Sequence, residues 1–157
     1  MDKKITNIVI GGLGGQGVLK ASDILAEAAL LQGFDVKKSE LHGMSQRGGS
    51  VSSDVRFGEE VLSPMVPTGE ADILLILTAD QVEPNLHCLK AGGILIKPDA
   101  VAAELLKNRK SLNVALLGKL SHHLPIAEEH WIAAIRSQLA EKLFDVNLQA
   151  FRLGRVK

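Results

Sequence analysis

The segment ITNIVIGGLGGQGVLK, residues 5–20, holds five of the fifteen glycines of the chain. The β-branched run before these glycines is typical of a strand that is buried on both faces of a parallel sheet. After them, Val18, Ala21 and Leu25 recur at the spacing of one helix face. The segment therefore predicts a buried strand, a tight glycine loop and an amphipathic helix.

The glycine loop is a candidate anion-binding site. Its glycines leave backbone N–H groups uncovered at the positive end of a helix, where an anion is favoured. Gly12, Gly14 and Gly17 satisfy the pattern G-x-G-x-x-G in the strand, loop and helix context that gives the pattern meaning. The predicted ligand contacts in this loop are Gly14, Gly15, Gln16 and Gly17. Two alternatives stay open: Gln16 caps its own loop, or the glycines only form a tight connection without a ligand.

A second segment rich in hydrogen-bond donors lies at residues 41–49, LHGMSQRGG. It follows a predicted strand at 34–39, and loops that leave the carboxyl ends of neighbouring strands converge in a doubly wound sheet. We therefore expect this segment to share one ligand with the glycine loop. Its predicted contacts are Ser45, Gln46, Arg47 and Gly48. The Arg47 guanidinium suits a phosphate or carboxylate because it binds such groups through two hydrogen bonds, and an ion pair with Glu40 is the alternative.

The rest of the chain predicts an α/β fold with a Rossmann-like, doubly wound, mostly parallel sheet. Alternation over 51–57 indicates a strand that we expect to form an antiparallel hairpin with 61–62. Residues 71–77 are the most apolar strand and belong near the centre of the sheet. The expected further helices are 82–89, ended by Gly92 and Gly93, then 101–106, and one helix after Pro125 with Ile132, Ile135, Leu139 and Leu143 on one face. Because no linker or repeat interrupts the pattern, we expect a single domain over residues 1–157.

Composition and charge exclude several classes of function. Lys plus Arg and Asp plus Glu both number 18, so the net charge gives no reason to expect binding to nucleic acid or to an anionic membrane. The single cysteine, Cys88, cannot form an internal disulfide or hold an iron–sulfur cluster. His42 has no accompanying nucleophile or carboxylate pair, and the adjacent His122 and His123 would point apart on a helix, so we predict neither a catalytic centre nor a metal site. No apolar run reaches the length of a membrane span, and we expect a cytoplasmic location.

Four features of the chain resemble one protein family when they are taken together. They are the loop Gly14-Gly15-Gln16-Gly17 after a strand, the segment 40–49, the tetrapeptide GEAD at 69–72, and residues 147–151. This combination resembles the gamma subunit or domain of the 2-oxoacid:ferredoxin oxidoreductases and, among them, the small beta subunit of the indolepyruvate type. The resemblance covers nearly the whole chain, and its specific part is the glycine loop together with H-G-M-x-Q-R-G-G.

The resemblance implies a role in a larger complex. In this family the complex decarboxylates a 2-oxo acid on thiamine diphosphate, passes electrons through iron–sulfur clusters to ferredoxin, and releases an acyl-coenzyme A. It implies that this chain is a non-catalytic subunit that helps to form the coenzyme A cleft. Thiamine diphosphate and the clusters would then be held by a larger partner subunit, ferredoxin would contact the chain only indirectly, and the isolated chain could form a homodimer.

The chain departs from the family pattern between Ile96 and Asn113. The resemblance implies a further strand and loop there, whereas the sequence offers only a short helix. Two other functions stay open beside the family role. One is a stand-alone Rossmann-type module for nicotinamide or adenine nucleotides, with Glu40 as the candidate acid for the ribose, and the other is a purely structural partner.

Overall fold

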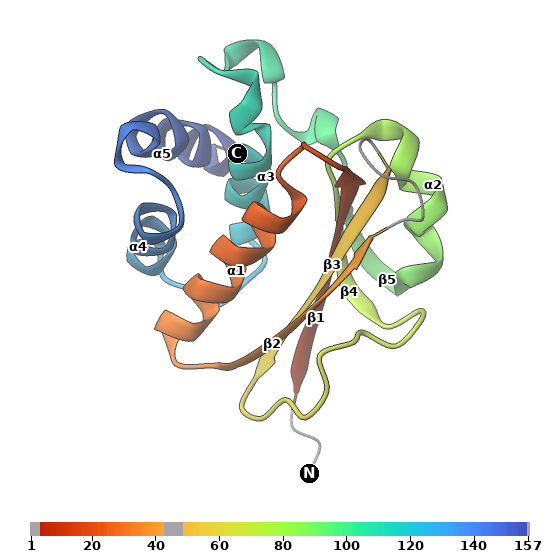
Figure 1. Cartoon of the computed structure of the whole chain (residues 1–157). Coiled ribbons are helices and arrows are strands. Elements are labelled where there is room, and N and C mark those ends of the chain that lie inside the picture. The colour runs from red at the N-terminus through yellow and green to blue at the C-terminus, as the bar shows by residue number, and fades with distance from the viewer. Residues whose placement is uncertain (1–3, 43–48, 157) are drawn as a thin grey trace.

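Five strands form one mixed sheet in the computed structural model of the chain, which describes residues 4–42 and 49–156 (Figure 1). The strands are β1 (Ile5–Leu13), β2 (Asp35–His42), β3 (Ser50–Gly58), β4 (Ala71–Ile76) and β5 (Leu89–Ile96), in the spatial order β2-β3-β1-β4-β5. β4 pairs in parallel with β1 and β5, and β3 lies antiparallel between β1 and β2. Four of these strands therefore point the same way, which confirms the predicted α/β fold with a mostly parallel sheet.

β1 is central because both of its faces are apolar. Ile8, Val9 and Ile10 are each at most 2% exposed. Ile8 and Ile10 belong to the large apolar cluster beneath the helices, whereas Val9 belongs to a smaller cluster on the other face of the sheet. Burial of each such side chain contributes about 1.5–3 kcal/mol, so this strand is a main source of stability.

The helices cover the two faces of the sheet unequally (Figure 1). One face carries α1 (Val18–Gln32), α3 (Leu112–Ser121), α4 (Glu128–Gln138) and α5 (Glu141–Arg155). Among the described residues, the opposite face carries the short α2 (Val82–Asn85) with a 3₁₀ turn on each side, together with part of the connection 59–70. None of the described helices is long and apolar enough to cross a membrane.

The ends and contacts of the helices follow from particular residues. Gly33, at φ 106°, ends α1 and donates its N–H to the Leu30 carbonyl at 3.0 Å, which confirms the predicted C-cap. The predicted single helix after Pro125 is instead two helices, because Leu139 and Ala140 adopt extended backbone angles. Lys20 donates from Nζ to the Gln138 carbonyl at 3.0 Å and so satisfies one of the orphan carbonyls at the end of α4.

α3 and α5 approach each other through two glycines. A Cβ on Gly154 would overlap the Ala115 carbonyl of α3, and a Cβ on Gly118 would overlap the Phe151 carbonyl of α5. The two backbones are therefore in direct contact. Trp131 of α4 and Phe151 are fully buried beside this contact, with ring centroids 5.6 Å apart, so Trp131 is a core residue.

Two further predictions about the sheet are wrong in detail. Residues 61–62 form no strand, and β3 pairs instead with β1 and β2. The connection containing them is held to the sheet, because the Val61 N–H donates to Asp35 Oδ2 at 2.8 Å. Gly92 and Gly93 do not end a helix but lie inside β5, where a register shift opposite β4 accommodates the positive φ of Gly92.

The segment between β5 and α3 contains no strand. It consists of three single 3₁₀ turns, Pro98–Ala100, Ala103–Leu105 and Arg109–Ser111, so the helix expected at 101–106 is reduced to one turn. β5 is consequently the edge of the sheet. The last of these turns leads directly into α3, at the end of the sheet where the glycine loop also lies.

Candidate functional site

The glycine loop turns the chain from β1 into α1. Gly15 and Gly17 have φ angles of 87° and 85°, in the left-handed region that favours glycine. Gly17 is the N-cap of α1 and its carbonyl accepts the Ala21 N–H at 2.9 Å. The loop therefore lies at the carboxyl end of β1 and at the positive end of a 15-residue helix, as predicted.

Part of the hydrogen-bonding capacity of the loop is used by the chain itself. The Gly14 N–H donates to the Gly49 carbonyl at 2.9 Å, so the end of the second segment does reach the glycine loop. The Gln16 N–H donates to the Leu13 carbonyl at 3.2 Å. Within residues 4–42 and 49–156, the N–H groups of Gly15 and Gly17 make no hydrogen bond and are the loop amides available to an anion.

Gln16 closes the loop from the inside. Its Oε1 accepts the Leu13 N–H at 2.8 Å and also the Thr78 hydroxyl. This is the geometry of the alternative in which Gln16 caps its own loop. Its Nε2 makes no hydrogen bond to the part of the chain that the structure describes, so the amide group remains a possible donor to a ligand.

A cleft of about 580 Å³ opens beside the loop. Its walls come from the glycine loop, the first turn of α1, the 3₁₀ turn before α3, the start of α3, and α5. The lining residues are Gly15, Gln16, Gly17, Lys20, Leu77, Asn108, Arg109, Lys110, Ser111, Leu112, Asn113, Val114, Leu139, Leu143, Val146 and Asn147. The carboxyl ends of β1 and β4 meet here, and the chain leaves β1 toward one face of the sheet and β4 toward the other (Figure 1). Such a switch point is where open α/β sheets bind ligands.

The charge of the cleft is positive. Lys20, Arg109 and Lys110 line it, and the described lining residues include no carboxylate. Lys20 donates one hydrogen bond from Nζ to the Gln138 carbonyl. The side chains of Arg109 and Lys110 form no ion pair or hydrogen bond with any described residue. The cleft therefore suits an anionic ligand.

Asn113 connects the cleft to the glycine loop. Its Nδ2 donates to the Gly17 carbonyl at 3.1 Å across 96 positions of sequence. Asn113 is only 7% exposed, and its Oδ1 is buried without a hydrogen-bond partner in the described part of the chain. An unsatisfied buried acceptor of this kind costs about 1–3 kcal/mol, which favours a donor that would pair with it.

The predicted site residues fall into two groups. Gly15, Gln16 and Gly17 line the cleft, and Gly14 precedes them in the same loop. The predicted contacts of the second segment, Ser45, Gln46, Arg47 and Gly48, lie outside the described residues, so their role stays a prediction. Glu40, the candidate acid for a ribose, is 3.2 Å from Lys38 in an ion pair on β2 and does not line the cleft.

The lining residues that sequence reasoning missed include Lys20, Arg109, Lys110 and Asn113. Lys20 could have been found, because it lies one helical turn after Gly17, on the helix that the loop begins. Arg109 and Lys110 lie in a segment without a hydrophobic period and Asn113 lies in the first turn of α3, all far from the loop in sequence. Only the packing of α3 beside α1 brings them to the cleft.

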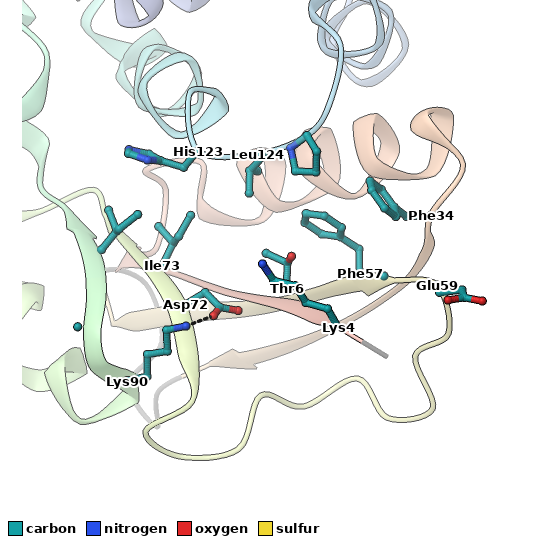
Figure 2. A pocket seen from close by; sticks show the side chains of 14 residues that line it. Lys4, Thr6, Phe34, Phe57, Glu59, Asp72, Ile73, Lys90, His123 and Leu124 are labelled. Carbon is teal, nitrogen blue, oxygen red and sulfur yellow. Dashed lines mark hydrogen bonds and ion pairs between the residues drawn. The ribbon is translucent and has the colours of Figure 1, made fainter. Parts of the chain in front are cut away.

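A second cavity, of about 500 Å³, lies at the opposite end of the sheet (Figure 2). Phe34 and Phe57 form part of its apolar wall, with ring centroids 5.1 Å apart. Two of its charges are paired within the chain, since Lys90 Nζ lies 2.5 Å from Asp72 Oδ1 and the Asn7 N–H donates to Asp72 Oδ2 at 2.7 Å, whereas Lys4 and Glu59 form no ion pair with any described residue. This cavity therefore carries charges of both signs, whereas the described lining of the cleft carries cations and no carboxylate.

The face of the sheet opposite the large helices buries Asp54. Burial raises the pKa of its carboxyl above the ordinary value, although a hydrogen bond from the Val66 N–H at 2.9 Å and the charge of Arg56 partly offset this. Burial and the nearby Asp54 charge also raise the pKa of the Cys88 thiol. Cys88 therefore lacks the thiolate character of a reactive cysteine.

Comparison with known proteins was made on the sequence and on the fold. Residues 7–100 match the model of the pyruvate ferredoxin/flavodoxin oxidoreductase family. The chain belongs to this family. Its sequence is 37% identical to the indolepyruvate oxidoreductase subunit IorB of Thermococcus kodakarensis, over 94% of this chain and 93% of that protein. The predicted resemblance is thereby confirmed.

Solved structures of family members share the fold. The gamma subunit of a keto/oxoacid ferredoxin oxidoreductase from Geobacter sulfurreducens superposes with a TM-score of 0.79 at 24% identity, over 96% of this chain and 94% of that one. The 2-oxoglutarate:ferredoxin oxidoreductase of Magnetococcus marinus, solved with 2-oxoglutarate, coenzyme A and succinyl-CoA bound, gives a TM-score of 0.85 at 22% identity. That match covers 98% of this chain but only 31% of the other, so the fold seen here is one part of a longer chain there.

Between the two ends of the sequence alignment, this chain has fewer residues than its relative. The alignment with the Thermococcus kodakarensis subunit runs over 188 positions, more than the 157 residues of this chain. The relative must therefore carry insertions. The reduced segment between β5 and α3 is consistent with the departure that the sequence predicted there.

Proposed function

We propose that this chain is the non-catalytic small subunit of a 2-oxoacid:ferredoxin oxidoreductase of the indolepyruvate type, and that its cleft forms part of the coenzyme A site. The observation that carries the proposal is the cleft, in which a glycine loop, a helix N-terminus and three cations meet, and whose described lining contains no carboxylate. A family relative is named as an indolepyruvate oxidoreductase subunit, and a protein with this fold was solved with coenzyme A bound.

The residues of the cleft fit the chemistry of coenzyme A. This ligand carries a pyrophosphate, a separate phosphate on its ribose and an adenine ring. The free N–H groups of Gly15 and Gly17 at the start of α1 suit the pyrophosphate. Lys20 adds charge, and the apolar side chains of Leu143 and Val146 suit the face of the adenine ring. The role of this chain is to bind and orient the ligand.

The redox chemistry belongs, in this proposal, to a larger partner subunit. Decarboxylation of a 2-oxo acid requires thiamine diphosphate, and electron transfer to ferredoxin requires iron–sulfur clusters. The single thiol of this chain, Cys88, cannot hold a cluster by itself. We therefore assign both groups to the partner, and copurification from the native host should yield a larger companion that contains them.

A second candidate is a purely structural subunit. It is favoured by the hydrogen bonds that the chain itself makes to Gly14 and Gln16, since these amides are not free for a ligand. In that case the glycines would only permit the tight turn between β1 and α1. The two candidates differ in whether a change in the loop alters the use of coenzyme A.

A matched pair of substitutions separates the two candidates. Gly15 and Gly92 both have positive φ, and nothing lies within 4 Å of a Cβ added at either position, but only Gly15 lines the cleft. Gly15→Ala and Gly92→Ala should each cost about 1–2 kcal/mol of stability, from backbone strain alone.

The measurement is the coenzyme A-dependent reduction of ferredoxin by indolepyruvate, in the complex assembled with the larger subunit. We expect Gly15→Ala to raise the KM for coenzyme A roughly tenfold, because the loop amides lose their alignment, and Gly92→Ala to leave it unchanged. If both variants kept the wild-type KM, the structural candidate would be preferred.

A further inference from the structure

We infer that the turn before α3 determines specificity for coenzyme A, because its residues Arg109 and Lys110 bind the ribose phosphate of this ligand. This inference rests on the proposed function and deepens it. It assigns a role to residues that neither the glycine loop motif nor the family resemblance includes. The inference follows from four observations on the cleft.

The first observation concerns two cations whose side chains have no partner among residues 4–42 and 49–156. Arg109 and Lys110 are adjacent, exposed and on the rim of the cleft, and their side chains pair with no described residue. Some other cations of the described chain are engaged by carboxylates, such as Lys38 with Asp23 and Lys90 with Asp72. A doubly charged phosphate monoester can bind a guanidinium and an ammonium together through charge-assisted hydrogen bonds.

The second observation is that the turn which carries these cations is held in place. The Asn108 Oδ1 accepts the Lys110 N–H at 2.9 Å, and the Ser111 hydroxyl donates to the Asn108 carbonyl at 2.6 Å. Ser111 is only 3% exposed. Because the backbone of the turn is fixed by its own side chains, less ordering is required of Arg109 and Lys110 when a ligand binds.

The third observation is the separation of two positive regions within one cleft. The Gly15 to Gly17 amides lie at the start of α1, whereas Arg109 and Lys110 lie immediately before the start of α3. Both helices begin at the cleft and neither has a side-chain N-cap bond. Two anionic groups on one ligand match this arrangement, and coenzyme A has two: its pyrophosphate and its ribose phosphate.

The fourth observation is Asn113, which lies between the two regions. It lines the cleft and donates from Nδ2 to the Gly17 carbonyl, and its buried Oδ1 has no partner among the described residues. An acceptor of this kind favours a ligand with an N–H donor, which the adenine amino group supplies. Together the four observations describe a site for a phosphorylated adenosine rather than for an isolated pyrophosphate.

Dephospho-coenzyme A tests the inference, because it lacks only the ribose phosphate. The assembled complex is assayed with coenzyme A and with dephospho-coenzyme A in the wild type, Arg109→Gln, Lys110→Gln and the double variant. Lys107→Gln is the matched control, since Lys107 is an exposed cation of the same segment that does not line the cleft. Lys110→Arg keeps the charge and tests for rescue.

We expect the wild type to have a KM for dephospho-coenzyme A at least roughly tenfold above its KM for coenzyme A. The double variant should lose this discrimination, because its KM for coenzyme A rises while its KM for dephospho-coenzyme A stays within about twofold of the wild type. Lys107→Gln and Lys110→Arg should retain the discrimination. Equal increases for both ligands, or no increase for either, would overturn the inference.

The complex that carries Gly15→Ala distinguishes a failure of this inference about Arg109 and Lys110 from a failure of the proposed function. If Gly15→Ala raises the KM for coenzyme A and the double variant does not, the cleft binds coenzyme A but the turn does not read its ribose phosphate. If neither change affects either KM, both the inference and the proposed coenzyme A site are wrong. The changed cations are exposed, so loss of folding is not expected to obscure the result.

Discussion

Each end of the sheet carries a cavity, and the two cavities differ in how the charged residues that line them are paired. At the amino ends of β1 and β4, Asp72 is satisfied by Lys90 and by the Asn7 N–H. At the carboxyl ends, the side chains of Arg109 and Lys110 and the buried Oδ1 of Asn113 have no partner in the part of the chain that the structure describes. A buried acceptor without a partner is costly to a fold, and a donor group from a ligand would remove that cost. This difference supports the proposed ligand site at the carboxyl end, while the Lys90–Asp72 ion pair stabilises the amino end.

The largest effect is expected from Gly17→Ala at the carboxyl end. An alanine there would adopt an unfavourable positive φ, and its Cβ would overlap the Asn113 side chain, whose Cγ lies 3.1 Å away. We expect a loss of about 2–4 kcal/mol in the free energy of unfolding, measured by urea denaturation. A loss no larger than that of Gly15→Ala would show that Asn113 moves aside easily and does not hold the loop.

Lys20→Gln should have the next largest effect and should act on binding. Glutamine can still donate to the Gln138 carbonyl, whereas the positive charge in the cleft is lost. We expect the KM for coenzyme A in the assembled complex to rise by roughly three- to tenfold with little change in stability. Lys37→Gln, on the exposed surface of β2, is the control and should leave the KM unchanged.

Asp72→Asn removes one charge at the amino end, and its effects on stability and on the KM for coenzyme A are compared with those of Lys20→Gln. Asparagine keeps an acceptor for the Asn7 N–H but loses the ion pair with Lys90. Because both side chains are partly exposed, we expect a loss of about 0.5–1 kcal/mol in stability and an unchanged KM for coenzyme A. A rise in KM like that of Lys20→Gln would contradict the assignment of separate roles to the two ends.

The smallest effect concerns Asp54, which lies in the middle of the sheet between the two ends. Its pKa is raised in the folded chain, so the folded state holds the proton more tightly than the unfolded state does. This contribution to stability is present below the ordinary pKa of aspartate and is lost as the pH rises through the raised value. Asp54→Asn should therefore be more stable than the wild type at neutral pH, and thermal melts should show the advantage shrinking as the solution is acidified. An advantage independent of pH would contradict this cause.

Much of the fold could be predicted from local sequence, and the errors have physical causes. The unit of β1, glycine loop and α1 follows from a buried β-branched run, glycines at positive φ and a helical period within residues 5–33. The 61–62 strand was wrong because a short apolar pair gives no information about which strand it would join. Gly92 and Gly93 were misplaced because glycines mark a helix end and a strand irregularity equally well.

The sequence by itself determined the position of the glycine loop at the start of a helix. That arrangement depends on residues that are adjacent in the chain. It also determined the family, because each motif that carries the resemblance is a continuous run of residues. Only the tertiary structure decided what faces the loop. Asn113 meets Gly17 across 96 positions, and Arg109 and Lys110 reach the same cleft because α3 packs on the helical face and is locked to α5 through Gly118 and Gly154. Contacts between segments so far apart depend on how the apolar faces of several helices are buried together, which no local pattern of residues specifies.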